Sequence, residues 1–165
     1  MRWMVGVDPR DLSAGAVAFA RWVAKRATQD RLVAAHVLEL ELQELFARVN
    51  PEDAADGIPD YVDRLLDPLR QDPSFVEVGT ISASTAEDGL QAAADERGCG
   101  ALVIGRRKPM KERALVRLGR VARRLLRTLP IPVVVVPPDA QEAPFSTGPI
   151  LIATALTRTS EGAAR

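Results

Sequence analysis

The chain has 165 residues, of which 47% are apolar and 27% charged, values that fit one globular domain and exclude a disordered chain. It has no apolar stretch near the roughly 20 residues of a membrane span, too short an apolar run before Asp8 for a secretory signal, and a single cysteine, Cys99, so we expect a cytoplasmic protein. The net charge is zero, but fifteen acids and three bases lie between Glu39 and Glu96, whereas ten bases and one acid lie between Arg106 and Arg127, which predicts an acidic side and a basic side.

Apolar runs alternate with amphipathic segments in the first half of the chain. The run WMVGVD at 3–8 ends in Asp-Pro and predicts a buried strand. Ser13 has the position of a helix N-cap before AGAVAFARWVAKRA, and RLVAAHVLEL at 31–40 predicts a second strand. In the acidic region that follows, PDYVDRLLDPLR at 59–70 predicts a helix.

The second half continues the alternation. Residues 75–82 alternate apolar and polar, which is typical of a half-exposed edge strand. The segment STAEDGLQAAADERG predicts a helix that opens with a Ser/Thr cap and ends at Gly98. The run ALVIG at 101–105 predicts a central strand, and IPVVVVPP at 131–138 predicts a fifth strand. Strands that alternate with helices predict a parallel sheet covered on both faces.

Residues 116–129 predict a helix with one apolar and one basic face. The apolar positions recur at spacings of three and four; they are Leu118, Val121, Ala122, Leu125, Leu126 and Leu129. The other face carries Arg117, Arg120, Arg123, Arg124 and Arg127. Such a face is typical of a solvated surface, and specific nucleic-acid recognition has no support, because neither aromatic residues nor a zinc or helix-turn-helix pattern accompanies it. An alternative is contact with the acidic 39–72 region of a partner molecule.

The segments VGVDPRDLSAGA, AAHVLEL, ALVIGRR and LGRVARRLLRTLPIPVVVVPP follow one another in an order and spacing that resembles the universal stress protein family. The resemblance spans residues 3 to about 138 and gives a domain at 1–139. It implies an α/β fold with an open, Rossmann-like, five-stranded parallel sheet of order 3-2-1-4-5. It also implies a homodimer through the last strand, whose valines are Val133, Val134, Val135 and Val136. Many members bind ATP and others do not, so ATP or AMP is the expected ligand, and no metal site is evident.

After Asp139 the sequence begins to repeat itself. Residues 140–148 resemble a linker, and 149–165, PILIATALTRTSEGAAR, resemble the first strand and helix start. Shifted by 147 positions, Ser160 falls on Ser13 and Gly162 on Gly15. We interpret this segment as the truncated start of a second tandem copy. Because a lone strand cannot bury both faces, we expect residues 150–155 to pair with a sheet edge, in this chain or in a neighbour.

The candidate ligand site follows from the strand order. In an open parallel sheet, ligands bind beyond the carboxyl ends of the strands where the order reverses, which the family's order puts between the strands ending at Asp8 and Gly105. The resemblance implies that Asp8 meets the ribose or adenine and that Val37 lines the adenine pocket. The alternative for Asp8 is an Asx-type turn before the helix.

The phosphate loop departs from the family's pattern. ATP-binding members carry a glycine, two residues, a glycine, nine residues, then glycine and a hydroxyl residue, which bring backbone N–H groups and a helix N-terminus to the phosphates. This chain keeps Gly105, has Lys108 for the second glycine, places Gly119 one residue late and has Arg120 for the hydroxyl residue. Two interpretations remain: the bulk of the basic side chains closes the pocket, or charge holds the phosphate. The basic residues concerned are Arg106, Arg107, Lys108 and Arg120.

These features predict a universal-stress-type regulatory or binding module, dimeric or tandem, with a degenerate nucleotide-binding loop. The alternatives are a slow ATPase and a nucleotide-free oligomerisation module. No residue is evident as the base for hydrolysis, so we name no catalytic residue and expect weak ATPase activity at most. His36, the only histidine, lies within an apolar strand and is expected to be structural.

Overall fold

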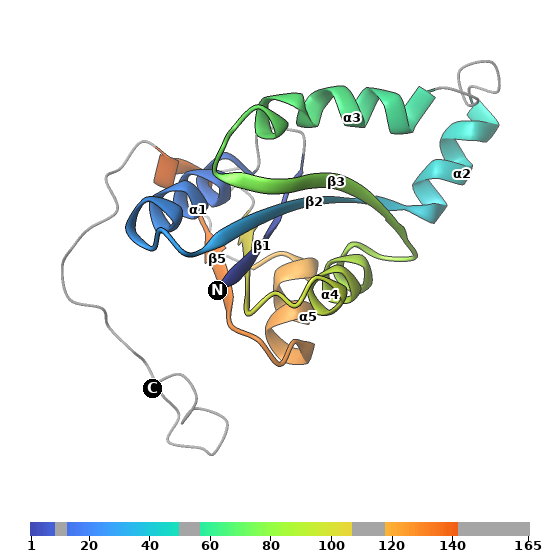
Figure 1. The fold of residues 1–165 in the computed structure, drawn as a ribbon. Coiled ribbons are helices and arrows are strands. Elements are labelled where there is room, and N and C mark those ends of the chain that lie inside the picture. The colour runs from blue at the N-terminus through green and yellow to red at the C-terminus, as the bar shows by residue number, and fades with distance from the viewer. Residues whose placement is uncertain (9–12, 50–56, 107–117, 142–165) are drawn as a thin grey trace.

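The computed structural model describes residues 1–8, 13–49, 57–106 and 118–141. Within these residues five strands form one sheet in the order β3-β2-β1-β4-β5, and every neighbouring pair is parallel (Figure 1). The strands are β1 (Arg2–Gly6), β2 (Arg31–Glu39), β3 (Phe75–Ala83), β4 (Ala101–Gly105) and β5 (Val133–Val136). The expected fold class and strand order are confirmed.

Helices cover both faces of the sheet (Figure 1). The helices α1 (Ala14–Arg26) and α3 (Gly57–Arg70) pack on one face, and α4 (Ala86–Glu96) and α5 (Arg120–Thr128) pack on the other. The remaining helices are α2 (Leu40–Val49), which follows β2 directly, and the short 3-10 helix η2 (Pro138–Gln141), which follows β5.

Alternate residues of each strand enter two separate apolar clusters. Val5 and Val103 pack under α1 and α3, whereas Met4 and Leu102 pack under α4 and α5. All four side chains are fully buried, as expected for central strands of a parallel sheet. Cys99 belongs to the second cluster, and burial raises the pKa of its thiol.

The helix ends follow most of the sequence signals. Thr85 caps α4 by accepting a hydrogen bond from the Asp88 N–H at 3.2 Å, and Gly98, with a φ of 59°, follows the end of that helix. Ser13 occupies the N-cap position of α1, but its hydroxyl caps no helix amide. The Ser13 Oγ instead accepts the N–H of Asp8 at 2.7 Å, across the start of the helix.

The apolar face of α5 is narrower than expected. Ala122 and Leu125 are buried, but Leu126 is 45% exposed, and Leu118, which is 37% exposed, lies before the first residue of the helix. The physical reason is that, among the described residues, α5 packs mainly against α4 and the edge strand β5, which cover one strip of the helix.

The helix α2 was not foreseen. It continues from β2 without the glycine or proline that usually separates two elements, so the sequence has no boundary signal there. None of the helices in the described part of the chain is long and apolar enough to span a membrane.

Candidate functional site

The strand order reverses between β1 and β4. Their last paired residues are Gly6 and Ile104, and from there β1 continues to α1 on one face while β4 continues toward α5 on the other. Asp8 and Arg106 therefore begin two diverging connections at the same edge of the sheet. This divergence is the arrangement that creates a ligand crevice in open α/β sheets.

The connection after β1 is fixed from both sides. The Asp8 N–H donates to the buried Ser13 hydroxyl, and the Val7 N–H donates to the Ala35 carbonyl at 2.9 Å. The Nδ1 of His36 donates to the Val7 carbonyl at 2.7 Å. His36 thus ties β2 to the end of β1, a contact that fits its expected structural role. The ligand contact assigned to Asp8 stays a prediction.

Val37 faces the helix layer. Its side chain is 9% exposed and belongs to the cluster under α4 and α5. A Cβ built on Gly89 of α4 would lie 2.8 Å from the Val37 Cγ1, so the helix packs directly on this side chain. The other side of the site is formed by β4 and β5: Gly105 pairs with Val136, and the Arg106 N–H donates to the Val136 carbonyl at 2.8 Å.

Gly119 is the N-cap residue of α5, in an extended conformation with φ −63° and ψ 169°. No atom of the described residues lies within 4 Å of a Cβ built there. Any residue type can adopt this conformation, so the described fold does not require glycine. As a glycine, Gly119 has no side chain with which to cap the first amides of α5. Arg107 and Lys108 lie outside the described residues.

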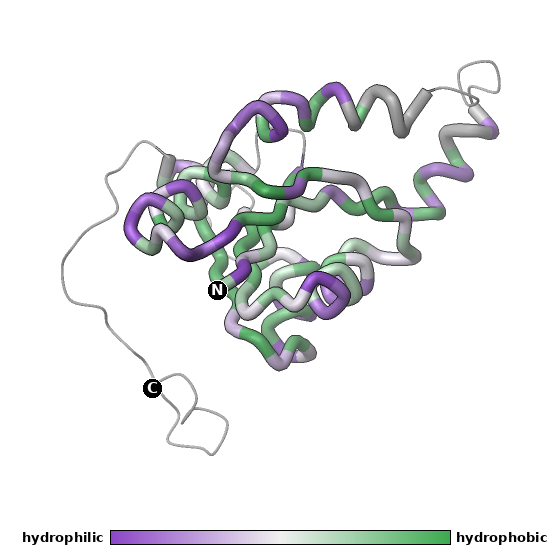
Figure 2. The backbone as a smooth tube through the Cα atoms, viewed as in Figure 1, coloured by the Kyte–Doolittle hydropathy of each residue, from purple (hydrophilic) through white to green (hydrophobic). Residues whose placement is uncertain are grey.

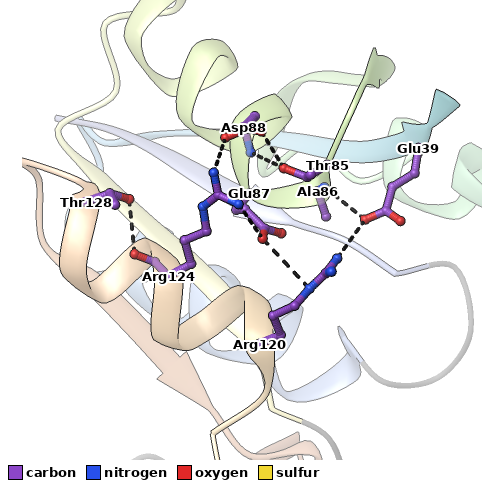
Figure 3. A network of polar contacts seen from close by, with 8 residues as sticks. All are labelled: Glu39, Thr85, Ala86, Glu87, Asp88, Arg120, Arg124 and Thr128. Carbon is purple, nitrogen blue, oxygen red and sulfur yellow. Dashed lines mark hydrogen bonds and ion pairs between the residues drawn. The ribbon is translucent and has the colours of Figure 1, made fainter. Parts of the chain in front are cut away.

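Arg120, the first residue of α5, faces acids of the same chain (Figure 3). Its Nη2 lies 3.7 Å from the Glu39 Oε1, and its Nε lies 3.9 Å from the Glu87 Oε1. One turn further, Arg124 lies 3.4 Å from Glu87 and 3.3 Å from Asp88. Two arginines that were expected on a solvated face therefore pair with carboxylates at the start of α4.

These carboxylates are well anchored. The Glu39 Oε1 accepts the N–H of Ala86, the first residue of α4, at 3.0 Å (Figure 3). The side chain of Glu87 is 3% exposed, and its Oε2 has no hydrogen-bond partner among the described residues. Both groups benefit from the positive end of the α4 dipole. With Asp88, three carboxylates face two guanidinium groups, so this network has a formal charge of −1.

Sequence reasoning missed the acidic half of this network. Glu87 and Asp88 lie in the first turn of a helix that the sequence predicted, but no sequence pattern linked them to the arginines of α5. Glu39 ends a strand, and no local pattern links it to an arginine far along the chain. Only the fold brings β2, α4 and α5 together at this edge.

An open, all-parallel α/β sheet with diverging connections at its switch point defines a Rossmann-like protein. The family model described as the Universal stress protein family matches residues 1–137. The chain therefore belongs to the universal stress protein family. No curated protein matches it significantly.

Solved structures agree with this fold. A universal stress protein from Archaeoglobus fulgidus has 21% identity and a TM-score of 0.61, over 82% of this chain and 98% of that one. A second, from Archaeoglobus fulgidus DSM 4304, has 21% identity and a TM-score of 0.57; 83% of this chain matches 45% of that protein. A universal stress protein in complex with cAMP has 22% identity and a TM-score of 0.51, over 84% and 97% of the two chains. At these identities the likeness establishes the shared fold.

Proposed function

We propose that this protein is a universal-stress-type binding module that holds an adenine nucleotide at the switch point between β1 and β4 without efficient turnover. The observation that carries the proposal is the divergence of the two connections beyond Gly6 and Ile104. The family membership and the solved relative with cAMP support the ligand class.

The base and ribose would lie beside the connection that starts at Asp8. The backbone of this connection is held by Ser13 and His36, so the Asp8 carboxylate would not need a large rearrangement to meet a ribose hydroxyl. The side chain of Val37 already packs against α4. Val37 would therefore touch the ligand only through its backbone or at the edge of the pocket.

The phosphate would lie at the start of α5. First-turn amides that Gly119 does not cap and the helix dipole favour an anion there, and no described residue crowds a Cβ built on Gly119. Arg106, Arg107, Lys108 and Arg120 would supply charge in place of the missing glycine and hydroxyl. Arg120 is 69% exposed, so it can turn toward a ligand, but it must leave Glu39 and Glu87 to do so.

The test is calorimetric titration of nucleotide-free protein with ATP, AMP and cAMP. Asp8→Ala and Gly119→Val should each remove saturable binding, because one deletes the ribose contact and the other places a branched side chain where the phosphate approaches. Asp95→Ala at the far end of α4 and Gly79→Val on β3 are matched controls and should bind as the wild type does. Absence of heat at millimolar ligand in folded wild-type protein would refute the proposal.

A nucleotide-free oligomerisation module is the second candidate, and the self-contained Arg120 network favours it. The strand β5 is an edge strand that pairs only with β4 among the described residues, so its outer side can accept a strand from another copy. Val133, Val134 and Val135 are half-buried. We propose that a homodimer forms through this strand, with or without the 149–165 segment, whether or not nucleotide is bound.

The tandem organisation is also a proposal. The relative of which this chain covers 45% has room for two such domains, which supports 1–139 as one domain, 140–148 as a linker and 149–165 as the start of a second. Nucleotide that stays bound through purification would support the binding module over the nucleotide-free oligomerisation module. Release of phosphate from ATP would instead support a slow ATPase.

A further inference from the structure

The helix α2 presents an apolar surface that the described residues do not cover. It projects from the carboxyl end of β2, beyond the two helix layers (Figure 1). Leu42 and Leu45 are 58% and 57% exposed, and Leu40 is 44% exposed. Figure 2 shows that α2 carries both hydrophobic and hydrophilic positions. Neighbouring exposed leucines on one short helix are typical of a contact surface.

Acidic residues flank these leucines. Leu42 and Leu45 lie one turn apart, and Glu41 and Glu44 stand beside them in the same exposed strip. Glu44 meets Arg48 at 4.0 Å, with both side chains largely exposed, a pair that contributes little. A ten-residue helix is marginal in water unless its apolar face packs, so α2 has a physical reason to find a partner.

The helix α5 presents the complementary surface. Leu126 is 45% exposed and lies between Arg123 and Arg127, which are also exposed. Arg120 and Arg124 pair with acids of this chain, but none of the ion pairs between described residues involves Arg123 or Arg127. An exposed leucine flanked by two arginines therefore faces outward on the α4–α5 side of the sheet.

We infer that α2 of one copy docks on α5 of a second copy, and that the contact is made twice in a two-fold dimer. The partner is another copy because the chain itself carries both halves, an acidic helix and a basic helix, while its net charge is zero. Pairing α2 with α2 would place the four glutamates of Glu41 and Glu44 together, so like charges exclude it. Burial of the leucines would stabilise the contact, and the opposite charges would favour α5 over α2 as the helix that α2 contacts.

The inference stands apart from the nucleotide site and from β5. Helix α2 begins directly after Glu39, which pairs with Arg120, but Glu41, Glu44, Arg123 and Arg127 form none of the ion pairs of the Arg120 network. The contact can therefore be tested in the full chain without added ligand.

The experiment uses two charge-reversed variants, Glu41→Arg with Glu44→Arg, and Arg123→Glu with Arg127→Glu. Within either variant both helices carry the same sign, so the α2–α5 contact should weaken about tenfold or more. A mixture of the two restores opposite charges at both contacts. A tagged copy of the first variant should therefore capture the second variant at least as well as tagged wild type captures untagged wild type. The same tagged copy should capture an untagged copy of the first variant poorly.

Controls separate this contact from others. The dimer through β5 proposed above would add the same capture to every combination, so the α2–α5 contact is measured as the difference between mixed and unmixed variants. No difference between them would refute the inference, as would a monomeric wild type at high concentration. Leu42→Gln with Leu45→Gln should weaken capture, whereas Val76→Gln on β3, where the side chain is 53% exposed, should leave it unchanged. Circular dichroism of each variant checks that it is folded.

Discussion

At the scale of single residues, Arg120 differs most from the pattern of ATP-binding family members. A hydroxyl there would donate one neutral hydrogen bond, whereas Arg120 adds a charge that Glu39 and Glu87 already face. A phosphate must therefore compete with two carboxylates for one guanidinium group. Each further negative charge on the ligand meets the net negative charge of the same network. We expect the site to prefer a ligand with one phosphate over a triphosphate.

Replacing Glu39 with glutamine should reverse part of this preference. The Glu39→Gln side chain keeps an acceptor for the Ala86 N–H but no longer holds Arg120 by charge. We expect ATP affinity to rise about fivefold, or about 1 kcal/mol, and AMP affinity to rise less. Titration calorimetry at low ionic strength measures both ligands.

The matched control is Glu96→Gln, on the same acidic side but at the other end of α4, where the carboxylate is 74% exposed. Equal gains for ATP and AMP would contradict a role in ligand selection. A wild type that binds neither ligand would instead contradict the proposed function itself.

Asp72 should make stability depend on pH in the acid range. Burial opposes ionisation of Asp72, but the Ser74 N–H at 2.9 Å and the Arg21 guanidinium outweigh it and hold the pKa of the carboxyl below its ordinary value of 3.8. Because the folded pKa is lowered, the stabilisation is fully present above pH 3.8 and is lost as pH falls through the folded value.

The variant Asp72→Asn should therefore lower the free energy of unfolding at pH 7 by about 1 kcal/mol. Urea unfolding at pH 7 and near pH 3 should show the difference between wild type and variant shrinking at the lower pH. The control Asp67→Asn removes a carboxylate that is 53% exposed and pairs with Arg70. It should change stability little at either pH.

At the scale of elements, α1 is packed against the chain backbone just after β5. A Cβ built on Gly15 would lie 2.0 Å from the Pro137 carbonyl oxygen and 3.0 Å from its carbon. These are backbone atoms, so the contact cannot be relieved by turning a side chain. Glycine at this position of α1 is required by close approach rather than by its own backbone conformation.

The variant Gly15→Ala should therefore be destabilising, although alanine is the better helix former. We expect a loss of about 3 kcal/mol, because overpacking against backbone exceeds the roughly 1 kcal/mol gained in helix propensity. Thermal or urea unfolding measures it. Gly79→Ala on β3 is the matched control, with no atom of the described residues within 4 Å, and a similar loss there would contradict the packing argument.

Elements with their own local signals could be predicted from the sequence. The strands ALVIG and VVVV are apolar runs, and prolines flank the second. The helix from Ala86 has a cap at its start and a glycine at its end. All three elements lie where expected. The helix α2 could not be separated from β2 in the sequence, because no glycine or proline marks the boundary at Glu39 and Leu40. The exposure of Leu126 could not be read from periodicity, which does not tell how much of a helix face its neighbours cover.

At the scale of the whole molecule, the segment 149–165 lies outside the described residues, and its pairing with a sheet stays a prediction. We expect residues 150–155 to resist limited proteolysis, because an added strand has its backbone groups hydrogen-bonded. Ile152→Asp should make the segment sensitive. Mass spectrometry of the digest measures where the chain is cut. Rapid trimming of the wild type back to about Pro144 would contradict the prediction.

The position of the candidate site was predictable at this scale, whereas its electrostatics were not. A strand order of 3-2-1-4-5 fixes where Asp8 and Gly105 emerge, whatever the side chains are. The charge balance around Arg120 depends on which acids reach it from β2 and α4, and those contacts join residues without any local sequence relation. The split into acidic and basic segments predicted an acidic side and a basic side, but not that Arg120 and Arg124 would pair with acids of the same chain.

The backbone contact between Gly15 and Pro137 also links the start of α1 to the segment through which the chain leaves the sheet. The segment η2, through which the polypeptide leaves the sheet, rests on α1, and α1 starts at the Ser13 hydroxyl that holds Asp8. A ligand that displaced the connection after β1 would therefore act on α1 and, through α1, on the backbone at Pro137.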